Sequence, residues 1–170
     1  MLVRFETIEP AAQQQADALA RLARSAGGDA SIVPGEDEGQ LWNDHRRRPW
    51  DREGAVIKIT LLPNAVGSLI AWLAESAGGA DYEVVGRAGV GVLLARVGGD
   101  AERQARVLTG LRQRLPVNIG SAVLVRGSED LRGRVDSWGP MGDGLSVMRA
   151  IKQQFDPLGI LNPGRGPGGL

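Results

Sequence analysis

The sequence contains no cysteine and a single histidine, His45. Without cysteine there can be no disulfide, no thiolate nucleophile and no thiolate metal ligand. One histidine cannot supply the paired or clustered imidazoles that hold zinc and related metals. We therefore expect no metal site of this kind within the chain and no catalysis by cysteine.

The chain also lacks a surplus of charge and a long apolar run. Its 20 basic and 20 acidic residues give a formal net charge of zero, whereas nucleic-acid binding draws on a basic surplus. No apolar run approaches the roughly 20 residues of a membrane-spanning helix. The N-terminal MLVRFETIEP lacks the apolar stretch of a secretory signal. We expect a cytoplasmic protein with no membrane span and no nucleic-acid partner.

What the chain does contain is enough apolar material for a core. It has 170 residues, of which 42% are hydrophobic, and folding at this length buries about 70% of the surface of the unfolded chain. No internal linker rich in proline, glycine or serine divides the sequence. We therefore expect one domain over residues 1–170.

The N-terminal part is predicted to form a strand, a helix and a second strand, followed by another helix. Pro10 and Gly27-Gly28 mark the two ends of the first helix. A break at Pro34-Gly35 ends the second strand, and Pro49 ends the second helix. The predicted elements are strand 2–6, a helix from residue 10, strand 30–33 and helix 37–48.

The middle of the chain has clearer periodicity. Ile57, Ile59 and Leu61 alternate onto one face of a strand. An apolar stripe at helical spacing follows, made by Val66, Leu69, Ile70 and Leu73 and ended by Gly78-Gly79. The predicted elements are strand 55–62, the helix around 66–73, strands 82–88 and 90–97, helix 101–116 with Leu108, Leu111 and Leu115 on one face, and strand 121–127.

That order is the split β-α-β unit of ferredoxin-like folds. We predict an α+β fold, in which an antiparallel sheet has helices packed mainly on one face and is extended by the N-terminal strand-helix-strand. Gly89-Val90-Gly91 lies between two predicted strands and lacks the third glycine of a dinucleotide-binding fingerprint. We interpret it as a bend in a hairpin.

Two groups of cations are candidate ligand sites. Arg46, Arg47 and Arg48 are consecutive, so they cannot share one helical face. They are either a solvated charge run at a helix end or include an arginine that binds an anionic ligand, with Trp42 as a wall of that site. Lys58 lies opposite the apolar face of its strand, either as an ordinary outward lysine or as a cation projecting into a cleft.

The C-terminal segment carries two turn signals after a last helix. The helix is expected to be capped by Asp143, to have the apolar face Val147, Met148, Ile151 and Phe155, and to end near Phe155. Asp156-Pro157-Leu158-Gly159 and Asn162-Pro163-Gly164 are the turns. Ile160 and Leu161 between them are predicted to anchor the segment. It serves equally well as a structural clasp or as a support for the Asn162 amide and the Arg165 guanidinium.

The closing LSVMRAIKQQFDPLGILNPGR resembles the C-terminal signature of FAD-linked oxidases of the vanillyl-alcohol oxidase/PCMH superfamily. In that signature a lysine-bearing helix is followed by F-D-P, then by I-L-N-P-G and a basic residue. Four further stretches follow the family's order: LWNDHR, VIKITLLP, GVGVLLARV and SWGP. The sequence is most similar to the FAD-binding subunits of glycolate oxidases.

The resemblance implies a two-domain flavoprotein of which this chain is the C-terminal cap domain, without the domain that binds FAD. It implies that Arg46 and Lys58 bind a 2-hydroxy acid substrate such as glycolate, and that Asn162 and Arg165 lie near the flavin. The chain alone is then expected to be inactive and not to retain FAD. An apolar patch rimmed by polar groups should be exposed near Asn162 and Arg165, where the missing domain packs.

The resemblance also implies partners: the FAD-binding domain of the same protein, and the catalytic flavoprotein and iron-sulfur subunits of a multisubunit oxidase, through which it would reach a membrane. Relatives that oxidise 2-hydroxy acids carry a histidine-rich metal element, which this chain lacks. We therefore assign no catalytic or metal-binding residue, and a role in electron transfer or assembly is as compatible as substrate turnover. The alternative is a free-standing ferredoxin-like module that binds a small ligand or dimerises, with no redox role.

Overall fold

The computed structural model describes residues 2–33, 35–79, 81–115 and 119–170. The predicted break at Pro34 and the predicted helix end at Pro116 lie outside these residues. The chain divides into two compact units, Met1–Asp44 and His45–Leu170, each treated by itself.

The first unit consists of helix α1 (Glu9–Ser25) and most of helix α2 (Glu36–Arg47). Pro10 lies in the first turn of α1, where its missing N–H costs no hydrogen bond. Gly27, with φ 81°, follows the last turn, and the Gly28 N–H donates to the Ala23 carbonyl at 3.0 Å. The ends of the first helix were thus predicted correctly.

The two N-terminal strands that the sequence predicts are absent. Residues 2–6 and 30–33 are not assigned to any strand; Leu2, Val3, Ile32 and Val33 are exposed, and Phe5 and Ala30 are only half-buried. A segment of four or five residues is stable as a strand only if a neighbour pairs with it and one face is buried. Neither condition is met within this unit, so the predicted extension of the sheet by an N-terminal strand-helix-strand is wrong.

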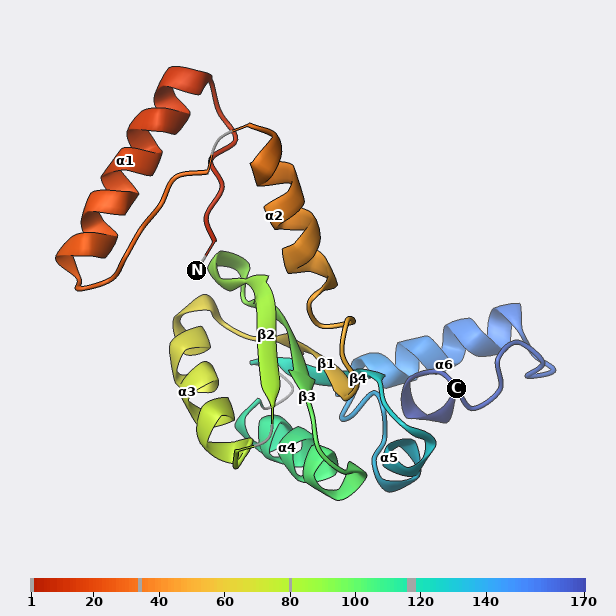
Figure 1. Ribbon diagram of the computed structural model, residues 1–170. Helices are drawn as coiled ribbons and strands as arrows, with labels where there is room; N and C mark the ends of the chain where they lie inside the picture. The colour runs from red at the N-terminus through yellow and green to blue at the C-terminus, as the bar shows by residue number, and fades with distance from the viewer. Residues whose placement is uncertain (1, 34, 80, 116–118) are drawn as a thin grey trace. The chain divides into compact units, whose positions relative to one another are not determined.

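The second unit is built on a four-stranded sheet, shown in Figure 1. Its strands are β1 (Ala55–Thr60), β2 (Tyr82–Arg87), β3 (Val92–Val97) and β4 (Ser121–Arg126). Their order is β2-β3-β1-β4, and each neighbouring pair is antiparallel. This confirms the predicted α+β fold with a ferredoxin-like arrangement. Short 3₁₀ turns cover Pro63–Ala65, Ala88–Val90 and Pro167–Gly169.

The core lies between one face of the sheet and helices α3 (Val66–Ser76) and α4 (Ala101–Arg114). Ile57 and Ile59 of β1 are fully buried there, as their alternation predicts. The α3 stripe is buried except for Ile70, which is 39% exposed. The short helix α5 (Glu129–Arg134) adds Leu131 to this core. Among the described residues of the second unit, no helix packs on the opposite face of the sheet, which we call the helix-free face.

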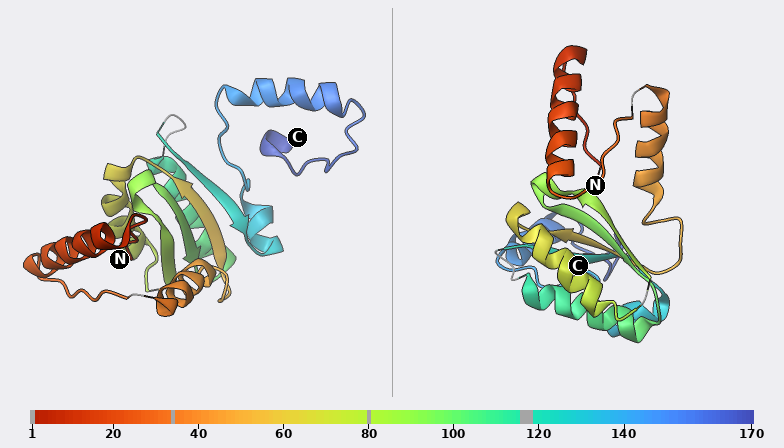
Figure 2. Two further views of the ribbon diagram at one scale, coloured as in Figure 1. Left: turned by 90° about the horizontal axis from the view of Figure 1, so that it is seen from above. Right: turned by 60° about the vertical axis from the view of Figure 1, so that its left-hand side comes forward.

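The last helix, α6 (Gly144–Phe155), contributes no buried residue. In Figure 2, α6 and the C-terminal segment lie apart from the helices that cover the sheet. Asp143 precedes α6, but its side chain makes no capping hydrogen bond. A capping side chain needs an extended backbone, whereas Asp143 has helical angles of φ −69° and ψ −20°. The predicted cap is therefore wrong in its contact, although the helix itself is where the sequence predicts it.

Candidate functional site

The predicted site residues lie in two stretches of the second unit, residues 46–58 and residues 162–165. Lys58 lies on the helix-free face of the sheet, and Arg46 lies in the last turn of α2. Asn162 and Arg165 lie in the C-terminal segment after α6. The two regions are built by different parts of the chain, and their roles in binding stay predictions.

Lys58 is placed by the alternation of β1. Its neighbours Ile57 and Ile59 point into the core, so the Lys58 side chain projects from the helix-free face and is exposed. In the sheet register it stands between Leu94 of β3 and Val123 of β4. It forms no hydrogen bond or ion pair with the residues that the structure describes. Such a cation between two apolar neighbours is available to an anion that approaches this face.

The three consecutive arginines separate, as the helical geometry requires. Arg47 pairs with Asp51 at 3.6 Å, and Arg48 approaches Glu83 of β2 at 3.8 Å. The Arg47–Asp51 pair is largely exposed and the Arg48–Glu83 pair is long and partly exposed, so each contributes little to stability. Arg46, in the same last turn of α2, has an exposed side chain. Trp42 donates its indole N–H to Glu38 at 3.2 Å within the first unit.

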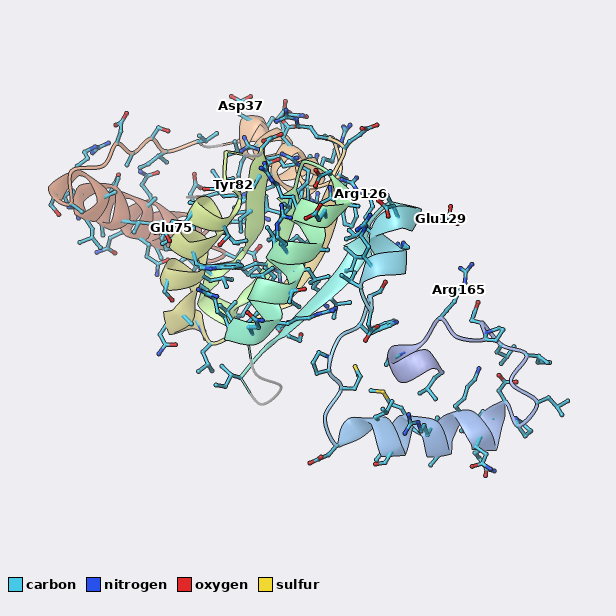
Figure 3. All side chains as sticks on the ribbon, turned by 90° about the horizontal axis from the view of Figure 1, so that it is seen from below. Asp37, Glu75, Tyr82, Arg126, Glu129 and Arg165 are labelled. Carbon is cyan, nitrogen blue, oxygen red and sulfur yellow. The ribbon has the colours of Figure 1, made fainter. Side chains whose placement is uncertain are left out.

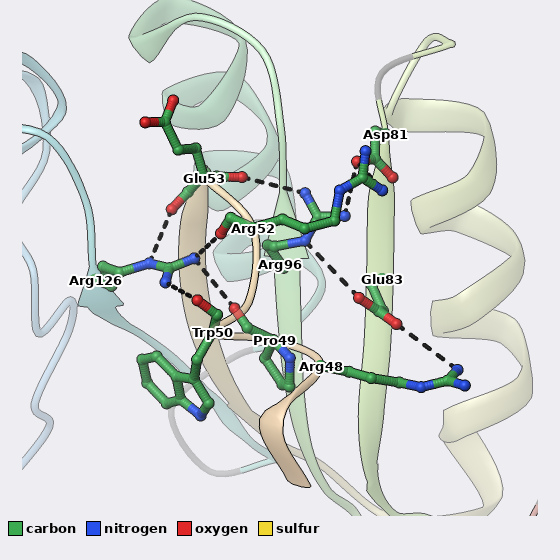
Figure 4. A network of polar contacts seen from close by, with 10 residues as sticks. Arg48, Pro49, Trp50, Arg52, Glu53, Asp81, Glu83, Arg96 and Arg126 are labelled. Carbon is green, nitrogen blue, oxygen red and sulfur yellow. Dashed lines mark hydrogen bonds and ion pairs between the residues drawn. The ribbon is translucent and has the colours of Figure 1, made fainter. Parts of the chain in front are cut away.

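Residues 48–54, which we call the strap, connect α2 to β1 and lie at one end of the helix-free face (Figure 4). Arg126 of β4 donates to four strap carbonyls. Its Nε bonds Gly54 at 3.2 Å and its Nη1 bonds Trp50 at 3.0 Å. Its Nη2 bonds Pro49 at 3.1 Å and Arg52 at 2.6 Å. The guanidinium also lies 5.5 Å from the centre of the Trp50 ring.

A second arginine, Arg96 of β3, holds the strap from the neighbouring strand. It is 1% exposed, and its Nη1 donates to the Glu53 carbonyl at 3.2 Å. Its charge is balanced by Asp81, 2.9 Å from Nη2, and by Glu83, 3.9 Å from Nε. A buried charge is tolerated only with such partners. Sequence analysis missed this pair of arginines. The available signal was Arg96, which lies inside the apolar run VLLARV and on the same face of the strand as Leu94.

The C-terminal segment is organised by the Asp156 carboxylate. It pairs with Lys152 of α6 and accepts the N–H groups of Ile160 and Leu161, both at 2.9 Å. The Lys152 ammonium also donates to the Leu161 carbonyl at 2.5 Å. The hydrogen bond from Lys152, together with those backbone N–H groups, lowers the pKa of Asp156 below its ordinary value. The lysine and aspartate of the closing motif therefore fix the loop between its two turns.

Both predicted turns are present. The Gly159 N–H donates to the Asp156 carbonyl at 3.0 Å, and the Arg165 N–H donates to the Asn162 carbonyl at 3.1 Å. In the second turn Gly164 has φ 73°, as a type II turn requires after proline. The predicted apolar anchor is wrong, because Ile160 and Leu161 are 71% and 59% exposed. Polar contacts to Asp156 hold the segment instead, since its carboxylate satisfies two backbone donors directly.

Asn162 lines an open groove of about 410 Å³ between α6 and the C-terminal segment. Asn162 itself has a left-handed backbone with φ 47°, which asparagine tolerates better than most residues. The other lining residues are Met148, Ile151, Lys152, Phe155, Asp156, Leu161, Gly166 and Leu170. Arg165 is exposed, and Figure 3 shows its side chain pointing away from α6. These amide and guanidinium groups are therefore accessible hydrogen-bond donors.

The start of the C-terminal segment is fastened to the body of the unit by Arg112 of α4. Its Nε donates to the Ala122 carbonyl at 3.1 Å, and its Nη2 donates to the Ser137 carbonyl at 3.2 Å. Burial lowers the pKa of Arg112, and the charge of Asp136 partly offsets this. Trp138 then donates its indole N–H to the Arg165 carbonyl at 2.9 Å. The two ends of the segment are thus joined next to its point of attachment.

An apolar surface accompanies these donors, as expected near Asn162 and Arg165. It consists of exposed side chains from α6 and the following loop: Val147, Ile151, Phe155, Leu158, Ile160 and Leu161, of which Phe155 and Leu158 are 79% and 83% exposed. Exposure of apolar side chains on this segment confirms that part of the expectation, whereas a partner that packs there stays a prediction.

The donor set fits one part of a flavin. Exposed amide and guanidinium groups match the oxygen and nitrogen acceptors of the isoalloxazine pyrimidine ring. Gly89-Val90-Gly91 lies in and just after the 3₁₀ turn Ala88–Val90 and leads into β3 and not into an α-helix, so it lacks the geometry of a dinucleotide-binding fingerprint. Among the described residues, no group of three histidine, aspartate or glutamate side chains could hold a metal ion. Nor is any described helix long and apolar enough to cross a membrane.

Residues 138–165 match the family model described as FAD linked oxidases, C-terminal domain. The matched range contains Trp138, α6, both turns and Arg165, and it supports a C-terminal domain of an FAD-linked oxidase. No curated protein and no solved structure matches the chain.

Proposed function

We propose that this chain is the cap domain of a flavin-dependent oxidoreductase that acts on a 2-hydroxy acid such as glycolate. The observation that carries the proposal is a coincidence of position. The segment that matches the oxidase family, residues 138–165, is also the segment that exposes an apolar surface beside Asn162 and Arg165. A cap domain needs that combination, because it must pack on the FAD-binding domain and reach the flavin at the same place.

The substrate is an anion, and the cap would supply cations to orient it. Lys58 on the helix-free face and Arg46 at the end of α2 are the groups that we assign to the substrate carboxylate. Bound FAD would accept the hydride from the carbon that carries the hydroxyl group. Asn162 and Arg165 would donate to the pyrimidine ring, where negative charge develops on reduction. We assign no general base to this chain, so the hydroxyl proton leaves to a group outside it.

The remaining parts of the proposal concern assembly. The FAD-binding domain of the same protein is the first partner, and it would contact the exposed side chains of α6 and the loop after it. Catalytic flavoprotein and iron-sulfur subunits of a glycolate oxidase are the further partners, and they would bring the otherwise cytoplasmic protein to a membrane. The chain by itself would neither retain FAD nor turn over substrate.

The test is reconstitution. The full chain is purified alone and after coexpression with the FAD-binding domain of an FAD-linked oxidase, and flavin is measured by its visible absorbance. We expect no flavin with the chain alone, a stable complex with the second domain, and anaerobic bleaching of the flavin by glycolate or D-lactate. Stoichiometric flavin on the isolated chain, or a chain that never associates with such a domain, would favour the free-standing module instead.

In the reconstituted complex, Lys58→Met tests the substrate role directly. Removal of the ammonium should raise KM for glycolate about tenfold or more, since a charge-assisted contact to a carboxylate is lost. Arg132→Met is the matched control, because it removes an exposed cation of α5. An unchanged KM in the Lys58 variant would contradict the assignment of this residue.

A further inference from the structure

The strap is attached to the end of α2 as well as to the sheet. The N–H groups of Trp50 and Asp51 donate to the Arg47 carbonyl at 2.8 and 3.2 Å. That carbonyl would otherwise be one of the unsatisfied groups at a helix C-terminus. The Arg47 side chain also pairs with Asp51 at 3.6 Å. The strap is therefore bonded directly to the last turn of α2, in which Arg46 lies.

The strap has few apolar contacts of its own to hold it. Pro49 is buried, whereas Trp50 is 43% exposed, and the strap contains two arginines, an aspartate and a glutamate. Hydrogen bonds to its backbone carbonyls hold the strap on the sheet instead of a packed apolar face. Arg126 binds four of them, and Arg96 binds a fifth, that of Glu53. Two arginine side chains from the sheet thus satisfy strap carbonyls that a neighbouring strand would otherwise satisfy.

The planar geometry of the Arg126 guanidinium matters here in addition to its charge. A guanidinium presents five N–H donors in one plane, and Arg126 spreads them over carbonyls of Pro49, Trp50, Arg52 and Gly54. A lysine in its place would keep the charge but could not span these acceptors. The two kinds of side chain therefore separate a geometric role of Arg126 from a purely electrostatic one.

We propose that Arg126, assisted by Arg96, is a positioning residue that holds Arg46 in place for the substrate carboxylate. The inference rests on the proposed function for the role of Arg46, but the contacts that carry it are those of the strap. Arg126 acts through the carbonyls of the strap and the capped end of α2, without touching the substrate itself. Its loss leaves Arg46 present but no longer held in one orientation.

The first test is trypsin digestion of the full chain under native conditions, with cleavage sites identified by mass spectrometry. The bond after Arg52 lies inside the strap and reports its opening. We expect Arg126→Lys and Arg126→Met to raise the rate at this bond about tenfold or more. Cleavage after Arg21, in the first unit, and the thermal midpoint of the second unit should stay close to wild type. Arg132→Lys is the control variant. A wild-type rate after Arg52 in Arg126→Lys would overturn the proposal.

The second test is a double-mutant cycle on KM for glycolate in the reconstituted complex. Arg46→Met and Arg126→Lys should each raise KM, and the double variant should be no worse than Arg46→Met alone. If Arg46→Met raises KM while Arg126→Lys opens the strap without changing KM, the positioning role is overturned. If Arg46→Met leaves KM unchanged, the inference also fails, whereas flavin bleaching by glycolate would leave the proposed function standing. Absence of bleaching in the wild-type complex overturns the proposed function and with it the role of Arg46, whereas the digestion separately decides whether Arg126 holds the strap.

Discussion

The indole N–H of Trp138 donates to the backbone carbonyl of Arg165 at 2.9 Å, across 27 residues of chain. This contact closes the C-terminal segment into a loop whose other side is α6. Trp138 is itself held in place by Asp136, which accepts the N–H groups of Trp138 and Gly139, both at 3.0 Å. The backbone at Arg165 is therefore held next to Trp138, near the start of the C-terminal segment.

Trp138→Phe tests this closure. The ring remains, but the hydrogen bond to Arg165 is lost, and a bond of this kind contributes about 1 kcal/mol. We expect faster amide hydrogen exchange at residues 162–168 and weaker association with an FAD-binding domain, with little change in the thermal midpoint of the sheet. Trp50→Phe is the control, because Trp50 also is partly exposed. Unchanged exchange in Trp138→Phe would show that the segment is held by other contacts.

The pKa of Asp156 leads to a prediction about pH. Its folded value is lowered, first by the hydrogen bond from Lys152 and then by the backbone N–H groups. The contribution of the ionised carboxylate to stability is therefore fully present above the ordinary aspartate value, and it is lost as pH falls through the lowered value. We expect the protection of the Ile160 and Leu161 amides, measured as exchange relative to the intrinsic rate at each pH, to fall as the solution becomes acidic. In Asp156→Asn this pH dependence should disappear; if it persists, another carboxyl group is responsible.

Gly139→Ala should destabilise the attachment of the C-terminal segment. Gly139 has φ 78°, and a Cβ there would lie 2.7 Å from Arg112 Nε. Backbone strain and displacement of the guanidinium together should cost about 1–3 kcal/mol, measured by chemical unfolding. Gly159→Ala is the matched control, since Gly159 has φ 64° but open space around its Cα. Equal losses of unfolding free energy in both variants would mean that the contact with Arg112 adds nothing to the cost of backbone strain.

Phe155→Ser tests the proposed interface with the FAD-binding domain without disturbing the fold. Phe155 is 79% exposed on α6, so its replacement should change the free energy of unfolding by less than about 0.5 kcal/mol. The same change should weaken binding of the FAD-binding domain, because an apolar anchor is lost from the interface. Leu108→Ala is the opposite control. Leu108 is fully buried, and its truncation should cost about 2–5 kcal/mol of stability. Undiminished binding by Phe155→Ser would place the interface elsewhere.

The central fold was predictable because its signals are local. Alternation in β1 and the apolar stripe of α3 each identify an element without knowledge of its neighbours, and their order then implies the ferredoxin-like sheet. The prediction of the N-terminal strands was wrong because it too relied on local signals alone. Residues 2–6 have the composition of a strand, but composition supplies no partner for the backbone. A strand exists only when another segment pairs with it, and that condition is not local.

The candidate site was predictable only in part. Lys58, Asn162 and Arg165 are predicted from strand alternation or from a motif, and their roles in binding stay predictions. The hydrogen bonds from Arg126 to the strap were not predicted, because donor and acceptors are separated by 72 to 77 residues in the sequence. An arginine at the end of a strand carries no sequence signal that distinguishes it from a solvated one. The expected apolar anchor at Ile160 and Leu161 was wrong because the side chain of Asp156 satisfies their N–H groups and leaves both side chains outside.

The amino-acid sequence by itself determined the elements of the central sheet, the helical faces that cover it, and the two proline turns that end the chain. These follow from side-chain periodicity and from restrictions on backbone angles, which act within a few residues. Tertiary structure alone decided which arginines bind carbonyls, which aspartate organises the last loop and which apolar side chains stay uncovered. Those outcomes depend on groups that meet only after the chain has folded, since hydrogen bonds and burial are properties of neighbours in space.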